Sequence, residues 1–263
     1  MIALSTGRGR LEPGFEFAAA AGVSALELAC QQPENRPGSF DDTRIATVRG
    51  LVERFGMTCV VHSASAVNCA ETDPTVRPAV VAHLLEYVDL TDRLGLDTLI
   101  VHAGYHFGLG LDEPLDALGR TLGEVAVRAH DRGITMVLEN MNVLPVEAEI
   151  RYLGCTAAEV LAILDSVDSP ALEACLDVGH AHLLPGGVSE FVEVLGPRIA
   201  YVQLTDNDGV VDDHLALGRG TLDVAATFDV LGRAGYDGLI GIELHDPTDR
   251  MDSLRYLRSI GLT

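Results

Sequence analysis

The chain has 263 residues, 48% of them hydrophobic and only 5% aromatic, and its formal net charge is −21 at pH 7. A core of Ala, Val, Leu and Ile suits buried parallel strands under helices, and a length of about 250 residues is typical of one (β/α)8 barrel. The 18 basic residues are all Arg and form no run. The composition therefore argues against a protein that binds nucleic acid through clustered positive charge.

Eight short β-rich runs alternate with longer segments of helical periodicity. The runs lie at residues 2–5, 25–29, 58–62, 98–102, 135–139, 174–177, 200–204 and 239–243. Most are continuously apolar, as strands buried on both faces are. The helical segments carry apolar residues at spacings of three and four, opposite acidic and Arg side chains. The clearest of these segments are residues 75–94, 114–132, 156–167 and 221–234.

Eight βα units without a break in composition predict one (β/α)8 TIM barrel, a single domain over residues 1–263. The rival is an open, doubly wound sheet, which would usually carry a G-x-G-x-x-G fingerprint after its first strand. Here Gly7 and Gly9 follow the first run without completing that fingerprint. We therefore expect no dinucleotide site.

The five cysteines stand apart in the sequence, without a C-x-x-C pair. An odd number is a poor disulfide framework, so we expect reduced, mostly buried thiols, as in a cytoplasmic protein. The amino terminus lacks a basic-then-apolar signal pattern, and no apolar stretch reaches the roughly 18 residues of a membrane span. We therefore expect no membrane partner.

Polar side chains stand at or next to the carboxyl end of six runs. They are His62, His102, Glu139, Asp177, Gln203 and Glu243, with Glu27 near the end of the second run. Each would cost several kcal/mol to bury without a partner. In a barrel all strand carboxyl ends open on one face, where catalytic groups gather. The alternative is that each is an isolated strand-end residue bonded to a loop amide.

Convergence of these groups predicts one bound divalent metal ion. Several carboxylates on one rim repel one another, and a divalent cation is the simplest way to keep them ionised. Oxygen-rich ligation suits Mg²⁺ or Mn²⁺ rather than a thiolate zinc site, with Co²⁺ and Zn²⁺ as alternatives. Further ligand-type residues follow in the loops, among them His180, Asp206, Asp212 and His214.

Several of these residues belong to motifs that resemble one known group of proteins. The motifs are VVHSAS (60–65), LIVHAGYH (99–106), VLENMN (137–142), CLDVGHAH (175–182), YVQLTDNDGVVDDHLALGRGTLD (201–223) and GIELHDP (241–247). They resemble the xylose isomerase-like TIM-barrel superfamily, and the resemblance covers nearly the whole chain. That superfamily holds sugar and sugar-phosphate isomerases and epimerases, inosose and dehydroshikimate dehydratases, and endonuclease IV-type enzymes.

The resemblance implies a metal-ligand set. In the epimerase and isomerase members four strand-end groups bind one divalent metal, commonly Mn²⁺, Mg²⁺ or Co²⁺. The matching positions are Glu139, Asp177, Gln203 and Glu243. The third of these is usually His. Some dehydroshikimate dehydratases of the superfamily carry Gln there, so Gln203 favours the dehydratase alternative.

The endonuclease branch implies a larger metal site. Its trinuclear zinc cluster also uses positions that match His62, His102, His180, Asp212 and His214, and all five residues are present. The His that Gln203 replaces is missing, however. Together with the absence of Lys and the net charge of −21, this argues against a DNA-repair enzyme, so we expect no nucleic-acid partner.

The leading hypothesis is carbon-acid chemistry on a small polyhydroxy carbonyl compound. The metal would polarise the carbonyl and stabilise the enediolate formed on deprotonation. Glu139 and Glu243 would remove a proton from a substrate carbon and return it, which gives epimerisation or isomerisation. His180 would hydrogen-bond a substrate oxygen or carry a proton.

Substrate contacts are predicted from the same rim. The candidates are His62, His102, His214 and Arg219. Arg219 would meet a phosphate or carboxylate of the substrate, with Arg8 and Arg10 as rivals for that role. Besides a sugar or sugar-phosphate isomerase or epimerase, three alternatives stay open: a dehydratase with the same first step, an endonuclease IV-like phosphodiesterase, and a non-catalytic barrel. Relatives are often dimers or tetramers, so a homo-oligomer stays open as well.

Overall fold

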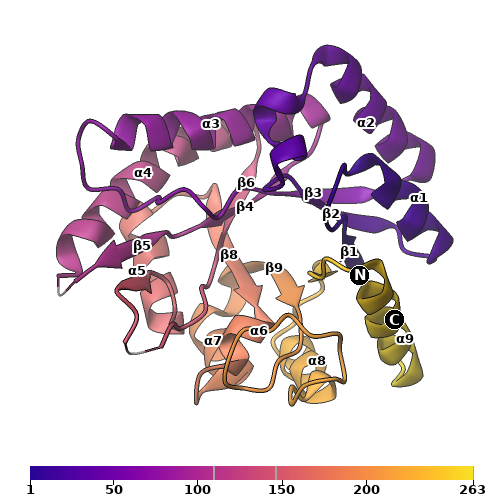
Figure 1. Ribbon diagram of the computed structural model, residues 1–263. Coiled ribbons are helices and arrows are strands. Elements are labelled where there is room, and N and C mark those ends of the chain that lie inside the picture. The colour runs from indigo at the N-terminus through magenta and orange to yellow at the C-terminus, as the bar shows by residue number, and fades with distance from the viewer. Residues whose placement is uncertain (109, 146, 263) are drawn as a thin grey trace.

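The computed structural model describes residues 1–108, 110–145 and 147–262, and its centre is a closed barrel of eight parallel strands (Figure 1). Neighbouring strands around the barrel follow the order β1-β10-β9-β8-β6-β4-β3-β2. They are β1 (Ile2–Ser5), β2 (Ala25–Ala29), β3 (Thr58–His62), β4 (Thr98–His102), β6 (Thr135–Glu139), β8 (Leu172–Asp177), β9 (Ile199–Leu204) and β10 (Ile240–Ile242). The predicted (β/α)8 barrel is confirmed.

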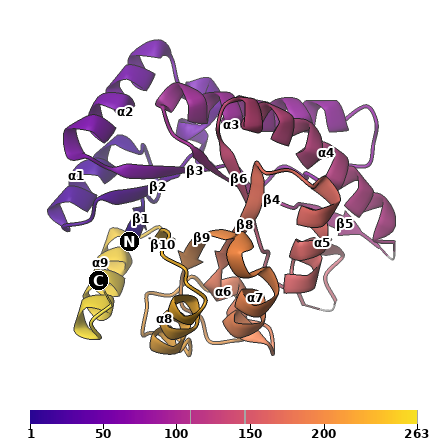
Figure 2. The same cartoon turned by 180° about the vertical axis from the view of Figure 1, so that it is seen from behind.

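Helices surround the barrel on its outer side, as the two opposite views show (Figures 1 and 2). They are α1 (Glu12–Ala20), α2 (Asp42–Phe55), α3 (Arg77–Leu94), α4 (Asp112–Asp131), α5 (Ala157–Val167), α6 (Val178–His182), α7 (Gly187–Leu195), α8 (Val224–Arg233) and α9 (Pro247–Ser259). Side-chain caps fix where several begin: Asp41 accepts from the amide of Arg44, and Thr156 from that of Glu159. Gly56 ends α2 in the left-handed conformation, at φ 59°.

Two short elements were not expected. The segment after β8 forms the one-turn helix α6, because the Asp177 carboxylate caps it by accepting from the amide of His180 at 2.7 Å. The loops after β4 and β6 form an antiparallel pair of β5 (Tyr105–Phe107) and β7 (Ile150–Tyr152). Both departures lie at the carboxyl ends of barrel strands, where loops shape a site rather than the core.

The barrel interior is filled in layers. One layer is apolar and consists of Val60, Ile100, Val137, Cys175 and Tyr201. Because side chains alternate between the two faces of a strand, the residue two positions further along also points inward. Those next residues are His62, His102, Glu139, Asp177 and Gln203. The polar ends of the apolar runs therefore form one polar layer above an apolar one.

Tyr201 accounts for the glycine at the centre of β10. A Cβ built on Gly241 would lie 2.1 Å from the Tyr201 hydroxyl oxygen, too close for any side chain. Gly241 therefore leaves room for the ring of Tyr201, which is buried inside the barrel. The backbone then carries Glu243 to the polar layer two residues later.

A larger apolar core lies between barrel and helices and consists mostly of Leu, Val, Ala and Ile. All five cysteines are free and buried, as expected. Among the described residues, no helix combines the length and the hydropathy that crossing a bilayer requires.

A buried ion pair joins α1 to α2. Glu12 accepts from Arg44 Nε at 2.8 Å, and its side chain is 17% exposed. Burial would raise the Glu12 pKa, but the hydrogen bonds from Arg44 and Arg10 outweigh it and lower the pKa from 4.5 to about 2. The ionised form therefore stabilises the fold above the unfolded pKa, and this contribution is lost as the pH falls from about 4.5 toward 2.

Replacing Glu12 tests this link between the first two helices. We expect Glu12→Gln to lower the free energy of unfolding by about 1–3 kcal/mol at pH 7, because it removes charge-assisted hydrogen bonds. The difference from wild type should shrink below about pH 4.5. Urea unfolding between pH 7 and pH 3 measures both effects. Glu16→Gln, on the exposed side of the same helix, is the matched control and should change little at either pH.

Candidate active site

The polar layer lines a cavity of about 250 Å³ at the carboxyl ends of the strands. Seven predicted strand-end and loop groups border it. The lining includes His62, His102, Glu139, His180, Asp212, His214 and Glu243. Asp177 and Gln203 are fully buried and do not line the cavity. The structure thus brings together residues that are up to 181 positions apart, from His62 to Glu243.

The first group of candidate metal ligands is His62, His102 and Glu139. The Nε2 atoms of the two rings are 3.1 Å apart, and Glu139 Oε2 lies 3.5 Å from His62 Nε2 and 3.2 Å from His102 Nε2. Donor atoms bound at about 2.1 Å to one ion lie about 3.0–3.4 Å from each other. The spacing of these three atoms fits a shared cation.

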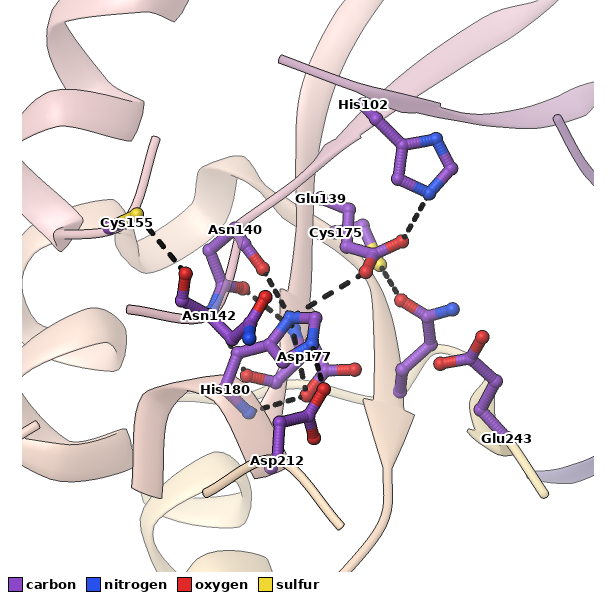
Figure 3. A network of polar contacts seen from close by, with 12 residues as sticks. His102, Glu139, Asn140, Asn142, Cys155, Cys175, Asp177, His180, Asp212 and Glu243 are labelled. Carbon is purple, nitrogen blue, oxygen red and sulfur yellow. Dashed lines mark hydrogen bonds and ion pairs between the residues drawn. The ribbon is translucent and has the colours of Figure 1, made fainter. Parts of the chain in front are cut away.

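Glu139 also belongs to a second group, with Asp177 and His180. Figure 3 shows the Glu139 carboxylate between the rings of His102 and His180, with Oε1 at 3.6 Å from His180 Nδ1. Asn140 holds this part of the rim together. Its amide nitrogen donates to the carbonyl oxygen of Asp177 at 3.1 Å, and its Oδ1 accepts from the Asp177 amide at 2.7 Å.

The third group is His180, Asp212 and His214. Both Nε2 atoms lie 3.1 Å from Asp212 Oδ2. The Nδ1 atoms face backbone carbonyls instead, that of Asn140 at 2.7 Å and that of Glu243 at 3.3 Å. A ring whose Nδ1–H donates to a carbonyl directs Nε2 the other way, here toward Asp212, and metal-binding His side chains are usually held in this manner.

Buried carboxyl oxygens give an independent test of whether a cation fits. Glu139 Oε2, Asp177 Oδ2 and Glu243 Oε2 are buried, and none has a hydrogen-bond partner among the described residues, although Glu139 Oε2 keeps its ion-pair contacts with His62 and His102. A buried carboxylate oxygen without a hydrogen bond is costly, and a metal ion removes that cost. Glu139, Asp177 and Glu243 therefore fit the predicted ligand roles by their chemistry, while the spacing groups Glu243 with Glu27 and His62.

The protonation preferences follow from the excess of carboxylates. Burial would lower the pKa of His180, but Asp177, Asp212 and Glu139 raise it to about 10. For Glu243, burial raises the pKa well above its usual range, and the carboxylates of Glu27 and Glu139 add to that effect. The site is thus short of positive charge, which a proton or a metal ion supplies.

Gln203 has a different environment from the other predicted ligands. Its backbone lies in register beside Asp177, but its amide is engaged elsewhere. Oε1 accepts from the Cys175 thiol at 3.0 Å, and Nε2 donates to Glu27 Oε2 at 3.4 Å. Its ligand role stays a prediction that would require the amide to leave these partners.

Arg219, another predicted site residue, lies away from both the cavity and the polar layer beneath it. Its guanidinium pairs with Asp249 at 2.7 Å and Asp252 at 2.6 Å, and its side chain is 53% exposed. Asp206, another ligand-type residue of this loop, is fully buried and accepts from the amides of Gly218 and Gly220. Both residues hold the loop after β9 in place.

Glu27 is a site residue whose role sequence reasoning missed. It is fully buried inside the barrel. Its Oε1 accepts from His62 Nδ1 at 2.9 Å, and its Oε2 accepts from the Tyr201 hydroxyl at 3.1 Å. Glu27 thereby orients His62 with Nε2 toward the first ligand group. The signal was present, because a carboxylate in the middle of the apolar run ALELA requires a buried partner.

A closed barrel with a polar, carboxylate- and imidazole-rich cavity at the carboxyl ends of its strands places the chain in the class of TIM-barrel proteins with a candidate active site at that face. Residues 15–260 match the family model described as xylose isomerase-like TIM barrel, and the chain belongs to that family.

The sequence relatives include an uncharacterized protein and probable endonucleases. The chain is 34% identical over 256 residues to the uncharacterized protein MJ1311 of Methanocaldococcus jannaschii, covering 94% of this chain and 84% of that protein. It is 26% identical over 258 residues to a probable endonuclease 4 of Staphylococcus epidermidis, covering 92% and 81%.

Solved structures place sugar epimerases among the neighbours. A D-tagatose 3-epimerase-like protein is 30% identical, with a TM-score of 0.84 and coverage of 98% of this chain and 96% of that one. A D-allulose 3-epimerase from Methylomonas sp., solved with D-allulose, has a TM-score of 0.82 at 22% identity, with coverage of 98% and 96%. At that identity the second likeness concerns the fold alone.

Proposed function

We propose that the chain is a divalent-metal-dependent sugar isomerase or epimerase that removes a proton next to a carbonyl group. The observation that carries this proposal is the set of three strand-end carboxylates, Glu139, Asp177 and Glu243, each with a buried oxygen that has no hydrogen-bond partner in the described structure. The similarity to a D-tagatose 3-epimerase-like protein supports it.

Glu139, Asp177 and Glu243 would hold the ion, with Gln203 as a fourth ligand only if its amide turned. When bound, a divalent ion polarises a carbonyl and neutralises the negative charge that develops on its oxygen. Mn²⁺ and Mg²⁺ suit the carboxylates, whereas the neighbouring imidazoles also suit Zn²⁺ and Co²⁺. His180 keeps Nε2 directed into the cavity because its Nδ1 is held by the carbonyl of Asn140.

The two proposed proton carriers lie at different edges of the His62 ring. Glu139 is 3.5 Å from its Nε2 and Glu243 is 3.6 Å from its Nδ1. A substrate carbon between the two carboxylates would lose its proton to one and regain a proton from the other. The C–H electron pair moves toward the carbonyl oxygen in the first step and returns to carbon in the second. Return to the same carbon inverts it, and return to its neighbour isomerises the sugar.

Proton exchange tests the proposal without knowledge of the product. Purified protein with Mn²⁺ would be incubated in D2O with a panel of ketoses, inososes and dehydroshikimate. We expect deuterium beside the carbonyl without loss of water, measured by mass spectrometry and NMR. A new ultraviolet-absorbing product would assign the runner-up, a dehydratase that starts with the same proton abstraction. Neither exchange nor elimination in any compound would contradict carbon-acid chemistry.

The two groups that each contain two imidazoles support a second candidate, a metal-dependent phosphodiesterase. His62 and His102 with Glu139 form one group, and His180 and His214 with Asp212 form another. The ligand atoms within each group are 3.1–3.5 Å apart, so each group could bind a metal ion of its own, in addition to an ion bound by the three carboxylates. Several relatives are named probable endonuclease 4. Two-metal sites stabilise both oxygens of an in-line displacement.

Hydrolysis of bis(4-nitrophenyl) phosphate and of a duplex with an abasic site distinguishes the two candidates. With Zn²⁺ added, turnover of the model diester and cleavage of the duplex would favour the phosphodiesterase. The proposed isomerase or epimerase instead predicts ketose exchange without duplex cleavage, in agreement with the net charge of −21, which repels polyanions.

A further inference from the structure

A second cavity opens directly beside the active site. It has a volume of about 820 Å³ and shares two lining residues, His214 and His245, with the cavity that holds the candidate metal ligands. The loop after β1, the beginning of α1 and the beginning of α9 form most of its remaining walls. The second cavity is therefore the neighbouring space for a substrate bound between the proposed proton carriers.

Arg250 is a buried cation in the wall of this second cavity. It is only 5% exposed and forms no ion pair among the described residues. One guanidinium nitrogen donates to the carbonyl oxygens of Leu244, at 3.1 Å, and His245, at 3.4 Å, and the guanidinium lies over the Phe17 ring at 5.0 Å. Its Nε is buried without a hydrogen-bond partner. A buried charge of this kind normally faces an opposite charge.

Gly7, which follows β1, leaves the space that this guanidinium occupies. A Cβ built on Gly7 would lie 2.0 Å from the nearest guanidinium nitrogen of Arg250, and Gly7 has a φ of 72°, which L side chains rarely adopt. Any other residue at this position would displace Arg250 from the wall. Gly7 thus allows the Arg250 guanidinium to lie at the wall of the cavity.

Arg8 adds a second cation to the same wall. It is exposed, and no carboxylate lies within ion-pair distance of it in the described structure. The third lining cation, Arg10, is already paired with Glu12 at 2.7 Å. Arg8 and Arg250 are therefore the positive groups that remain available to a ligand.

Most of the acidic residues around the cavity are already engaged. Asp246 caps α9 by accepting from the amide of Thr248 at 2.7 Å, and Asp249 pairs with Arg219. Asp213 is the lining carboxylate for which the described structure gives no partner. In a chain of net charge −21, two guanidinium groups on one cavity wall without an ion pair in the described structure are a local exception.

We propose that this second cavity is an anion subsite that receives the phosphate or carboxylate group of an open-chain sugar whose carbonyl end lies at the active site. The subsite would take its specificity from Arg8 and Arg250, because guanidinium groups bind both phosphate and carboxylate through paired N–H donors. That the anionic group belongs to a sugar substrate rests on the proposed function, whereas the binding of an anion to this cavity does not.

Binding of inorganic phosphate to the chelator-treated protein tests the subsite without any bound metal. We expect saturable binding by calorimetry in the wild type, weakened about 10-fold or more in Arg8→Gln, since one charge-assisted contact is lost. Arg233→Gln is the matched control, because Arg233 is an exposed residue of α8 outside this cavity, and it should bind as the wild type does. Arg250→Lys, which keeps the charge but not the paired donors, should also weaken binding.

The absence of saturable binding, or equal affinity in Arg8→Gln and the wild type, would overturn the subsite and leave only adventitious association with phosphate. A second arm compares deuterium exchange into ribulose 5-phosphate, a ketouronate and ribulose. We expect Arg8→Gln to lower the preference in kcat/KM for an anionic over the neutral sugar by about 10–100-fold. The anionic sugar that shows the larger loss identifies phosphate or carboxylate.

The two arms separate the subsite from the proposed function. If ribulose exchanges as well as its phosphate and Arg8→Gln leaves their ratio unchanged, the subsite is wrong and the proposed function stands. If phosphate binds through Arg8 but no sugar exchanges, the proposed function fails and the anion site remains.

Discussion

Glu139→Gln should remove high-affinity binding of a divalent metal and lower proton exchange by about 1,000-fold or more. Glu139 is shared by two of the groups with ligand-like spacing, since Oε2 faces His62 and His102 and Oε1 lies 3.6 Å from His180. Burial would raise the Glu139 pKa, but these imidazoles lower it to about 2, so the residue is an anion at neutral pH. The amide keeps the volume and removes that charge.

Competition with a fluorescent chelator measures the metal affinity, and circular dichroism checks the fold. The matched control is Glu173→Gln, in the neighbouring strand β8, where Glu173 is paired with Arg198 at 2.6 Å and lies outside the cavity. It should bind metal as the wild type does. Unchanged affinity in Glu139→Gln would remove Glu139 from the proposed ligand set.

Glu243→Gln should retain the fold but lose proton exchange by about 100- to 10,000-fold at saturating metal, which is the usual contribution of a general acid or base. Its carboxylate is buried, has one oxygen without a partner in the described structure, and lies near the anions of Glu27, Glu139 and Asp177. A carboxyl group whose pKa is raised in this way holds a proton more readily than a free one, which suits a group that both accepts and donates a proton.

The same variant, which should lose activity, should not lose stability in the metal-free state. A folded-state pKa above the unfolded value means that ionised Glu243 destabilises the metal-free protein, increasingly as the pH rises above about 4.5. Metal-free Glu243→Gln should therefore melt at or above the wild-type temperature at pH 7, with the difference vanishing near pH 4. Wild-type exchange rates in this variant would exclude Glu243 from proton transfer. A markedly lower melting temperature would show that its charge stabilises the fold.

The barrel and most of its strand bounds were predictable because they depend on local pattern. Five predicted runs, including 58–62 and 135–139, coincide with the observed strands, and the others differ by one or two residues at their ends. The polar layer followed from the same pattern. Apolar runs that end in His62, His102 and Glu139 must bring those ends together once the sheet closes.

The remaining features depend on side-chain direction and tertiary contact, which sequence spacing does not specify. Gln203 stands beside Asp177 in the sheet, yet its amide binds Cys175 and Glu27. Arg219 follows a strand of the rim, yet it pairs with α9 on the outside. In both cases a nearer partner competes with the site. Of the proposed anion subsite, Arg8 was a candidate from its place after the first strand, whereas Arg250 was not, because it reaches the cavity from the last helix.

The most direct test of the central claim is an anomalous-difference map, recorded at the manganese edge, from crystals of this protein grown with Mn²⁺. The account predicts a peak within coordination distance of Glu139, Asp177 and Glu243, at the carboxyl ends of the strands. A map with no peak there, at a Mn²⁺ concentration that supports activity, would contradict the convergence of these carboxylates on one cation.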